Sequence, residues 1–194
     1  MDRYDRYPSG DSFGRIHQED LCQALAVPPT RKYQNEGGPS PSAIADLFRR
    51  AMPTRVAEQA VRWFADALIW NWLIGGTDAH AKNYSLLLSQ GEARLAPLYD
   101  IASALPYGDH EEKLRLAMKI GGDYQLNPHR NRWPDAARDL GLPAAELVAR
   151  ARELAAAVAD AAKTPDVLAQ ESELPARLTD LVAERSKRCA RLLG

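Results

Sequence analysis

Gly-Gly-Thr-Asp-Ala-His-Ala-Lys-Asn-Tyr-Ser-Leu-Leu-Leu at residues 75–88, followed by Leu-Ala-Pro-Leu-Tyr-Asp at residues 95–100, is the stretch around which the chain is organised. Four of its polar side chains adjoin apolar runs, namely Asp78, Lys82, Asn83 and Asp100. A charged group beside an apolar core is costly unless something pairs with it. The pattern therefore predicts a functional site in this stretch rather than a solvated loop.

The residue types in this stretch suit phosphoryl transfer. Mg²⁺ takes oxygen ligands and is usually held by one or two carboxylates together with substrate phosphates. Asn83 and Asp100 can supply two such oxygens. Transfer to a hydroxyl also needs a base near the acceptor and a cation near the moving phosphate. Asp78 and Lys82 are the candidates for these two tasks.

A β-hairpin is expected to bring the two oxygen ligands together. Residues 84–89 read as one strand and residues 94–98 as the return strand, with Gly91 in the polar turn between them. If the turn is centred between Gly91 and Glu92, antiparallel pairing sets Asn83 opposite Asp100. Paired residues lie about 4.5–5.5 Å apart, so the hairpin would place both side chains at one metal ion.

Helices are expected to dominate the rest of the chain, which predicts a mainly α (α+β) fold. Residues 1–17 show no periodicity, and Ser40 followed by Pro41 is a helix N-cap and first turn. Gly75 and Gly76 should end the long central helix. The predicted helices cover residues 18–26, 41–51, 55–74, 134–140, 144–163 and 175–193, with a weakly alternating strand at residues 113–120.

Length and composition favour a single domain over residues 1–194. A chain of 194 residues with 45% hydrophobic residues can bury an ordinary core. A net charge of −1 gives no general attraction to nucleic acid or to an anionic membrane. The most apolar stretch, residues 67–76, is far shorter than the ~20 residues of a membrane span, and the N-terminus is charged rather than leader-like. Cys22 and Cys189 lie far apart without metal-ligand spacing, and Cys22 reads as a buried thiol in a reducing cytosol, so the expected location is cytoplasmic.

Several of these residues also have a simpler interpretation. Asp78 after Gly-Gly-Thr can cap a turn, and a single His80 is more often a structural histidine than a ligand. Near the C-terminus, basic side chains complement the dipole of the last helix without any ligand; these are Arg185, Lys187, Arg188 and Arg191. Only the combination of spacings through the hairpin favours a site.

The motif at residues 78–83 together with the motif at residues 95–100 resembles the catalytic and metal-binding motifs of the HipA family. These proteins are serine/threonine kinases that serve as toxins in bacterial toxin–antitoxin modules. Three further segments resemble family landmarks in the same order, and they are residues 15–25, residues 32–40 and residues 116–118. The similarity covers almost the whole chain and is strongest over residues 3–121.

The resemblance implies a fold and a set of roles. The chain would be the helical C-terminal lobe of a protein-kinase-like fold, with the hairpin carrying the metal site and the N-terminal lobe absent. Asp78 matches the catalytic aspartate, and Asn83 and Asp100 match the Mg²⁺ ligands. The positions that match residues near ATP are Asp2, Tyr4, His80, Lys82, Asn83, Tyr99 and Asp100.

The resemblance also implies partners, although other functions stay open. The expected partners are a protein substrate, for which an aminoacyl-tRNA synthetase is the suggested class, a DNA-binding antitoxin and a separate N-terminal lobe. Direct nucleic-acid or membrane binding is not expected. The first alternative is a truncated, non-catalytic binding module that contacts an antitoxin or a partner subunit. A remoter one is a metal-dependent hydrolase using Asp78, His80 and Asp100, for which few His and carboxylate groups cluster.

Overall fold

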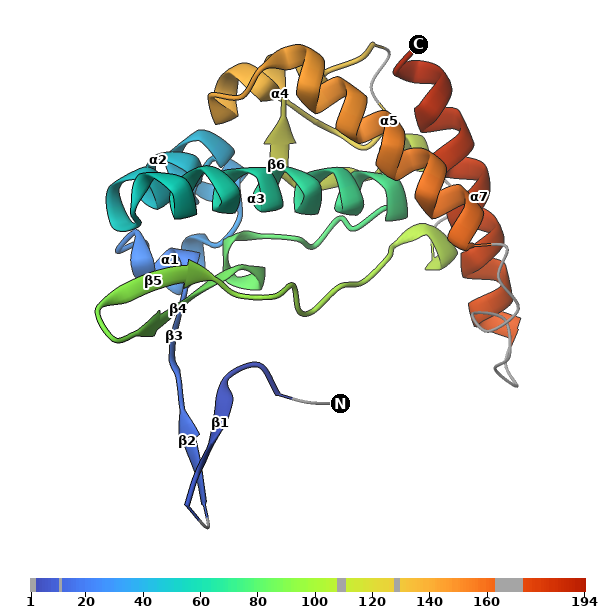
Figure 1. The fold of residues 1–194 in the computed structure, drawn as a ribbon. Coiled ribbons are helices and arrows are strands. Elements are labelled where there is room, and N and C mark those ends of the chain that lie inside the picture. Colours follow the sequence, from blue (N-terminus) through green and yellow to red (C-terminus); the bar gives the residue numbers. More distant parts are fainter. Residues whose placement is uncertain (1–2, 11, 108–110, 128–129, 163–172) are drawn as a thin grey trace. The chain divides into compact units, whose positions relative to one another are not determined.

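The computed structural model describes residues 3–10, 12–107, 111–127, 130–162 and 173–194 (Figure 1). Among the described residues helices are the main elements and the strands are short, so the predicted mainly α fold with small hairpins is confirmed. The chain divides into two compact units. The first unit comprises residues 1–63 and 80–100, and the second comprises residues 64–79 and 101–194.

The first unit contains a two-stranded hairpin, a three-stranded sheet and helices. Strands β1 and β2 pair as an antiparallel hairpin, and the other sheet has the order β3-β4-β5. Its elements are β1 (Arg6–Ser9), β2 (Ser12–Arg15), β3 (His17–Asp20), α1 (Leu21–Ala24), α2 (Pro41–Ala51), the first part of α3 (Thr54–Ile74), β4 (Ser85–Ser89) and β5 (Glu92–Leu95). Its core includes Leu21, Cys22, Ile44, Phe48, Val61 and Leu86.

The predicted helix at residues 18–26 is largely wrong. The segment from His17 to Asp20 pairs with β4 as an antiparallel strand, and only four residues after it are helical. Asp20 ends the strand by capping this turn. Its carboxylate accepts from the Gln23 N–H at 2.9 Å, and the Gln23 side chain accepts from the Asp20 N–H at 2.9 Å. This reciprocal capping box explains where the strand changes to a helix.

The predicted hairpin exists, but its register differs from the prediction. Leu86 lies opposite Leu95, and Ser89 lies opposite Glu92. The turn is therefore the two-residue pair Gln90 and Gly91, whose φ angles are +54° and +80°. Two left-handed residues are the signature of a tight type I′ hairpin turn. Because β5 already ends at Leu95, the backbone ladder does not extend to Asn83 and Asp100.

Helix α3 ends at Ile74, directly before Gly75 and Gly76, as the sequence predicts. Gly75 has a φ of +69°, and the Gly76 N–H donates to the Asn71 carbonyl at 2.7 Å. This is the bond of a Schellman motif, in which a left-handed glycine turns the chain away from the helix axis. A β-carbon at Gly75 would lie 2.7 Å from the side chain of Leu105. A larger residue is therefore excluded here by both conformation and space.

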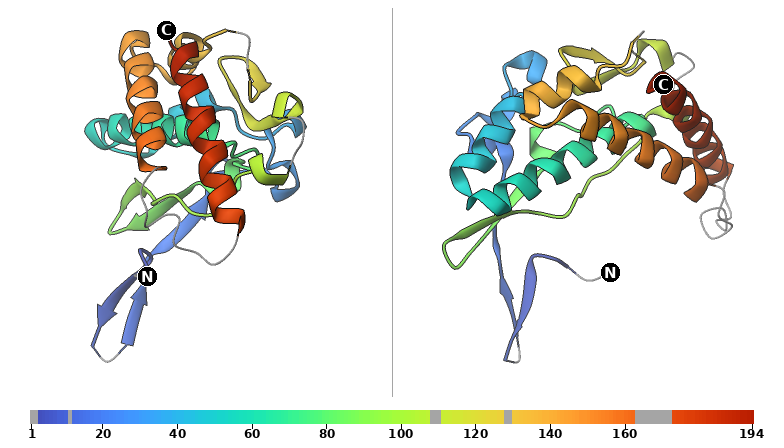
Figure 2. Two further views of the ribbon diagram at one scale, coloured as in Figure 1. Left: turned by 90° about the vertical axis from the view of Figure 1, so that its right-hand side faces the viewer. Right: turned by 45° about the horizontal axis from the view of Figure 1, so that its top comes forward.

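The second unit is built from helices around the last part of α3. Helix α5 packs against α4 and α7, and Figure 2 shows α5 and α7 side by side. The Arg150 guanidinium of α5 donates to both carboxylate oxygens of Asp66 in α3, at 2.9 and 2.8 Å. The other helices and strands of the second unit are β6 (Arg115–Ile120), β7 (Asp123–Gln125), α4 (Trp133–Leu140), α5 (Ala144–Ala161) and α7 (Glu173–Leu192).

The core of the second unit centres on aromatic and aliphatic side chains. The Trp72 and Trp133 rings meet edge to face with their centroids 5.5 Å apart, and the Trp72 indole N–H donates to the Leu126 carbonyl at 3.0 Å. Other fully buried members are Ile69, Leu73, Leu140, Ala151 and Ala155. In the part of the chain that the structure describes, every helix falls short of what a membrane span requires in length and apolarity.

Candidate functional site

Asn83 and Asp100 form a direct side-chain contact in the first unit. The Asn83 amide nitrogen donates to a carboxylate oxygen of Asp100 at 2.6 Å. Asn83 is 5% exposed, whereas Asp100 is exposed and has a φ of +54°. The amide oxygen of Asn83 accepts from the His80 N–H at 3.1 Å. The structure therefore brings together the two residues that the sequence proposed as metal ligands, through the segment before β4 and the segment after β5 rather than through the ladder.

Tyr99, the residue before Asp100, forms hydrogen bonds with the segment that leads into β4. Its hydroxyl donates to the Lys82 carbonyl at 2.7 Å and also contacts the Ser85 hydroxyl. Because the phenol has only one hydrogen, the Ser85 hydroxyl is the donor in the second bond. Burial raises the pKa of Tyr99, and the phenol of Tyr4 adds to this effect. Tyr99 therefore stays a neutral donor that holds the backbone of Lys82 in place.

His80 is part of a packed aromatic contact. It is 6% exposed, and its ring meets the Tyr33 ring edge to face at a centroid distance of 5.1 Å. The Ala81 N–H donates to the Lys32 carbonyl at 3.3 Å, and the Lys32 ammonium lies 5.0 Å from the centre of the Tyr33 ring. The sequence identified residues 32–33 only as a landmark. The structure shows that they support the loop that carries His80 and Asn83.

The other predicted site residues are divided between the two units. Asp78 is exposed and belongs to the second unit, just after the glycine turn that ends α3. Lys82 is partly buried in the first unit, within a short 3₁₀ turn (Ala81–Asn83). Tyr4 is 36% exposed in the first unit. Asp2 lies outside the described residues.

Asn83 and Asp100 are the residues that would hold a Mg²⁺ ion, and they would need phosphate oxygens to complete its shell. Within the described ranges of the chain, no three His, Cys, Asp or Glu side chains gather as a self-sufficient metal site would need. Asn83 and Asp100 can therefore contribute at most part of a coordination shell, which is how proteins usually hold Mg²⁺ beside nucleotide phosphates. The Asn83 amide presents its nitrogen to Asp100 and its oxygen to the His80 N–H. Binding of a metal by the Asn83 oxygen would therefore require the amide to turn and give up the bond from His80, whereas the exposed Asp100 carboxylate needs no such change.

Sequence reasoning missed the role of Arg185. Complementing the helix dipole, which is the sequence-based explanation for the basic residues of the last helix, does not account for Arg185. Its side chain is 1% exposed and binds groups outside its own helix. A signal was present, because Arg185 lies four residues before Cys189 and eight before Leu193, both buried. Such spacing puts a charged residue on the apolar face of a helix.

The sequence matches the family described as HipA-like C-terminal domain over residues 1–162. The protein Y4mE of Sinorhizobium fredii is 41% identical over 144 residues, which cover 73% of this chain and 33% of that protein. The serine/threonine-protein kinase toxin HipA of Shewanella oneidensis is 30% identical over an alignment of 211 positions, covering 100% of this chain and 47% of the toxin. The chain thus spans less than half the length of these relatives.

Two solved structures share the fold. The HipA chain in a complex of Shewanella oneidensis HipA, HipB and operator DNA has a TM-score of 0.83 at 23% identity, covering 98% of this chain and 48% of that one. The Helicobacter pylori proinflammatory kinase CtkA has a TM-score of 0.50 at 13% identity, covering 92% of this chain and 67% of that one. At these identities the likeness concerns the fold alone.

Proposed function

The chain belongs to the HipA-like C-terminal domain family, and from this membership we propose that it is the catalytic half of a Mg²⁺- and ATP-dependent serine/threonine protein kinase. The observation that carries the proposal is the contact of 2.6 Å between Asn83 and Asp100. Two residues distant in sequence, and matched separately to metal-binding motifs, meet in the fold. A relative that is 30% identical along the whole chain is named as a kinase toxin.

In this proposal the first unit holds the nucleotide phosphates. Asn83 and Asp100 would hold Mg²⁺, which when bound neutralises charge on the phosphates. Tyr99 keeps the Lys82 backbone in place through its hydrogen bond of 2.7 Å, and we assign the Lys82 ammonium to the transferred phosphate. We assign His80 and Tyr99 to the nucleotide, and Tyr4 and Asp2 to the adenine. Their assignment rests on the family motif.

Asp78 is proposed as the base that accepts the proton of the substrate hydroxyl. Its exposed position suits a group that must reach a protein substrate. A positioned base of this kind typically contributes about 10²–10⁴-fold in rate. Because Asp78 belongs to the second unit, this role rests on the Asp-Ala-His-Ala-Lys-Asn motif at residues 78–83 and not on a distance.

The partners follow from the same reasoning. The structurally similar HipA was solved with HipB and operator DNA, so we propose a DNA-binding antitoxin as a partner of this chain in the cytoplasm. The formal net charge of −1 argues against direct nucleic-acid binding by the chain itself. The proposed substrate is a protein, with aminoacyl-tRNA synthetases as the class to test first.

A second candidate is a non-catalytic module that binds an antitoxin or a partner subunit. The observation in its favour is that the structurally similar HipA was solved with HipB and operator DNA. In this candidate the chain binds its partner and does not catalyse phosphoryl transfer, which needs groups placed in advance around the transferred phosphate.

A reconstitution experiment distinguishes the two. The chain is mixed with a separately produced N-terminal half of a HipA-type kinase, and transfer of labelled γ-phosphate from ATP to serine or threonine is measured. The kinase proposal expects Mg²⁺-dependent transfer by the mixture and its loss in Asp100→Asn. Asp139→Asn, a matched change at an exposed aspartate of α4, should keep it. Association of the halves without any transfer would support the binding module instead.

A further inference from the structure

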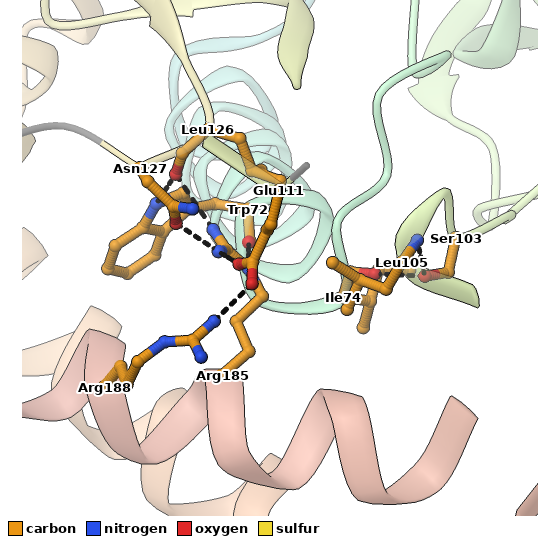
Figure 3. A network of polar contacts seen from close by, with 9 residues as sticks. All are labelled: Trp72, Ile74, Ser103, Leu105, Glu111, Leu126, Asn127, Arg185 and Arg188. Atoms are coloured by element: carbon orange, nitrogen blue, oxygen red, sulfur yellow. Dashed lines mark hydrogen bonds and ion pairs between the residues drawn. The ribbon is translucent and has the colours of Figure 1, made fainter. Parts of the chain in front are cut away.

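Arg185 of α7 is almost completely buried, with a side-chain exposure of 1%. Its Nε donates to the Trp72 carbonyl at 2.9 Å, and one terminal nitrogen donates to the Leu126 carbonyl at 2.9 Å. The other terminal nitrogen contacts the side chains of Asn127 and Glu111 (Figure 3). One guanidinium therefore joins α7 to the end of α3 and to two loops of the second unit.

The charge of this guanidinium is balanced inside the unit. Burial alone would raise the pKa of Glu111, but Arg185 and Arg188 outweigh it and hold that pKa below its ordinary value of 4.5. Arg188 is half exposed and contacts the second carboxylate oxygen of Glu111. A buried guanidinium that lost these partners would be costly. The network therefore favours a single arrangement of α7 and the Trp72 carbonyl.

Trp72 lies in the last turn of α3, where carbonyl groups lack partners within the helix. The neighbouring Asn71 carbonyl accepts from the Gly76 N–H at 2.7 Å, which belongs to the glycine turn. The Trp72 carbonyl accepts from Arg185 on another helix. The end of α3 is thus held partly by its own turn and partly by α7.

Two further backbone carbonyls between the end of α3 and Asp78 accept hydrogen bonds. The Ser103 hydroxyl donates to the Ile74 carbonyl at 2.5 Å (Figure 3). The Gly75 carbonyl accepts from the N–H groups of Ala104 and Thr77, both at 3.0 Å. The Trp72, Ile74 and Gly75 carbonyls are thus all hydrogen-bonded to other groups of the second unit, so we expect a shift of the helix end to be transmitted along the loop.

We propose that Arg185 is a positioning residue for the Asp78 loop, residues 75–78, acting through the Trp72 carbonyl. The inference rests on the proposed kinase function, in which Asp78 is the base. A reacting group misplaced by about 1 Å can lose about 10²-fold in rate, so the position of the helix end matters for chemistry. α7 lies beyond residues 1–162, which the family comparison matched. The positioning group therefore comes from outside the matched region.

Amide hydrogen exchange of the 194-residue chain tests this without requiring kinase activity. The unchanged chain is compared with Arg185→Lys, which keeps the charge but loses the planar set of donors, and with Arg185→Met. We expect the Gly76 and Thr77 amides to exchange about tenfold faster in Arg185→Lys, because a hydrogen bond to a charged group is lost. Amides inside α5, such as those of Ala151 and Ala155, should change much less.

Matched variants separate positioning from general stability. Arg177→Met removes an exposed arginine from the same helix and should leave every amide unchanged. Arg188→Met weakens the contact to Glu111 without touching Trp72, and it should leave Gly76 and Thr77 near their original rates. If Arg185→Met does not fold, Arg185→Lys and Arg188→Met carry the comparison. Unchanged loop amides in Arg185→Lys, or loop and α5 amides accelerated by the same factor, would overturn the proposal.

A kinetic measurement follows in the reconstituted kinase. Arg185→Lys should lower kcat by about 10²-fold, the effect of a misplaced base, and should leave the KM for ATP near its original value. Equal kcat in both proteins would reject the positioning role. If the unchanged chain transfers no phosphate, the proposed function fails, while the exchange rates of Gly76 and Thr77 still decide whether Arg185 positions the loop.

Discussion

Asn83 and Asp100 are hydrogen-bonded through their side chains at 2.6 Å, although they lie 17 positions apart in the chain. The buried amide is held on its other side by the His80 N–H, whereas the carboxylate is exposed. One partner is therefore fixed by the fold and the other is open to ligands. In the proposed Mg²⁺ site, the exposed carboxylate would bind the ion beside phosphate oxygens and water.

The first prediction is that this pair binds Mg²⁺ directly. Titration of the chain with MgCl₂, followed by amide NMR shifts, should perturb residues 80–85 and 99–100 first. Asp100→Asn removes the only formal negative charge of the pair. The affinity of this variant for Mg²⁺ should fall by at least about tenfold, which is the smaller loss typical of mutating residues that only hydrogen-bond to a metal ligand. Asp139→Asn, which changes an exposed aspartate of α4, serves as the control. Shifts spread evenly over surface carboxylates would contradict a site here.

The second prediction concerns the base. In the reconstituted kinase, Asp78→Asn should lower kcat by about 10²–10⁴-fold, because the amide cannot accept the substrate proton. Its circular dichroism spectrum and unfolding midpoint should stay close to those of the unchanged chain, since Asp78 is exposed. Asp139→Asn again controls for the loss of one surface charge. Full phosphorylation by Asp78→Asn would reject Asp78 as the base.

The third prediction is a pH dependence of stability that comes from Glu111. Burial raises its pKa, but Arg185 and Arg188 together lower it further than burial raises it. A carboxyl whose folded pKa lies below its unfolded value stabilises the fold above the unfolded pKa, and this stabilisation is lost as the pH falls through the folded pKa. Glu111→Gln should therefore cost about 1–3 kcal/mol at neutral pH, and the difference should shrink under acid.

Urea unfolding of both proteins across the acid range measures this difference. Asp180→Asn removes an exposed carboxylate of α7 and is the matched control for surface charge. A penalty for Glu111→Gln that stays constant from neutral pH to well below pH 4.5, the ordinary pKa of the group, would show that the ion pairs with Arg185 and Arg188 are not its source.

Elements specified by local sequence were predictable. Ser40 accepts from the Ala43 N–H at 3.1 Å and starts α2 with Pro41, as its residue type suggested. The glycine that ends α3 needs a left-handed conformation, and its identity alone indicated this. Such features depend on neighbours within one helical turn, so their signals are present in a short window of sequence.

Elements specified by distant partners were not predictable. β3 is a strand because β4 offers it a pairing edge, whereas its own sequence, His-Gln-Glu-Asp, has little strand preference. The hairpin register depended on Gln90, a residue other than glycine at a φ of +54°. Asn83 and Asp100 still meet, but through the segments that flank the hairpin and lie outside the strand pairing. The role of Arg185 could be predicted only with knowledge of what α7 packs against.

The last prediction is that an isolated polypeptide of these 194 residues folds but binds ATP weakly. Each unit has its own apolar core, and the second is also held by Arg150 with Asp66 and by the Arg185 network. The contacts assigned to ATP come from a few residues on one side, chiefly Lys82, Asn83 and Asp100. We therefore expect a Kd for Mg-ATP in the millimolar range, near about −4 kcal/mol, and no phosphate transfer. Calorimetric titration measures the affinity, and addition of the N-terminal half should tighten it because donors would then surround the phosphates. Micromolar binding or transfer by the chain alone would show that this polypeptide carries the complete nucleotide site.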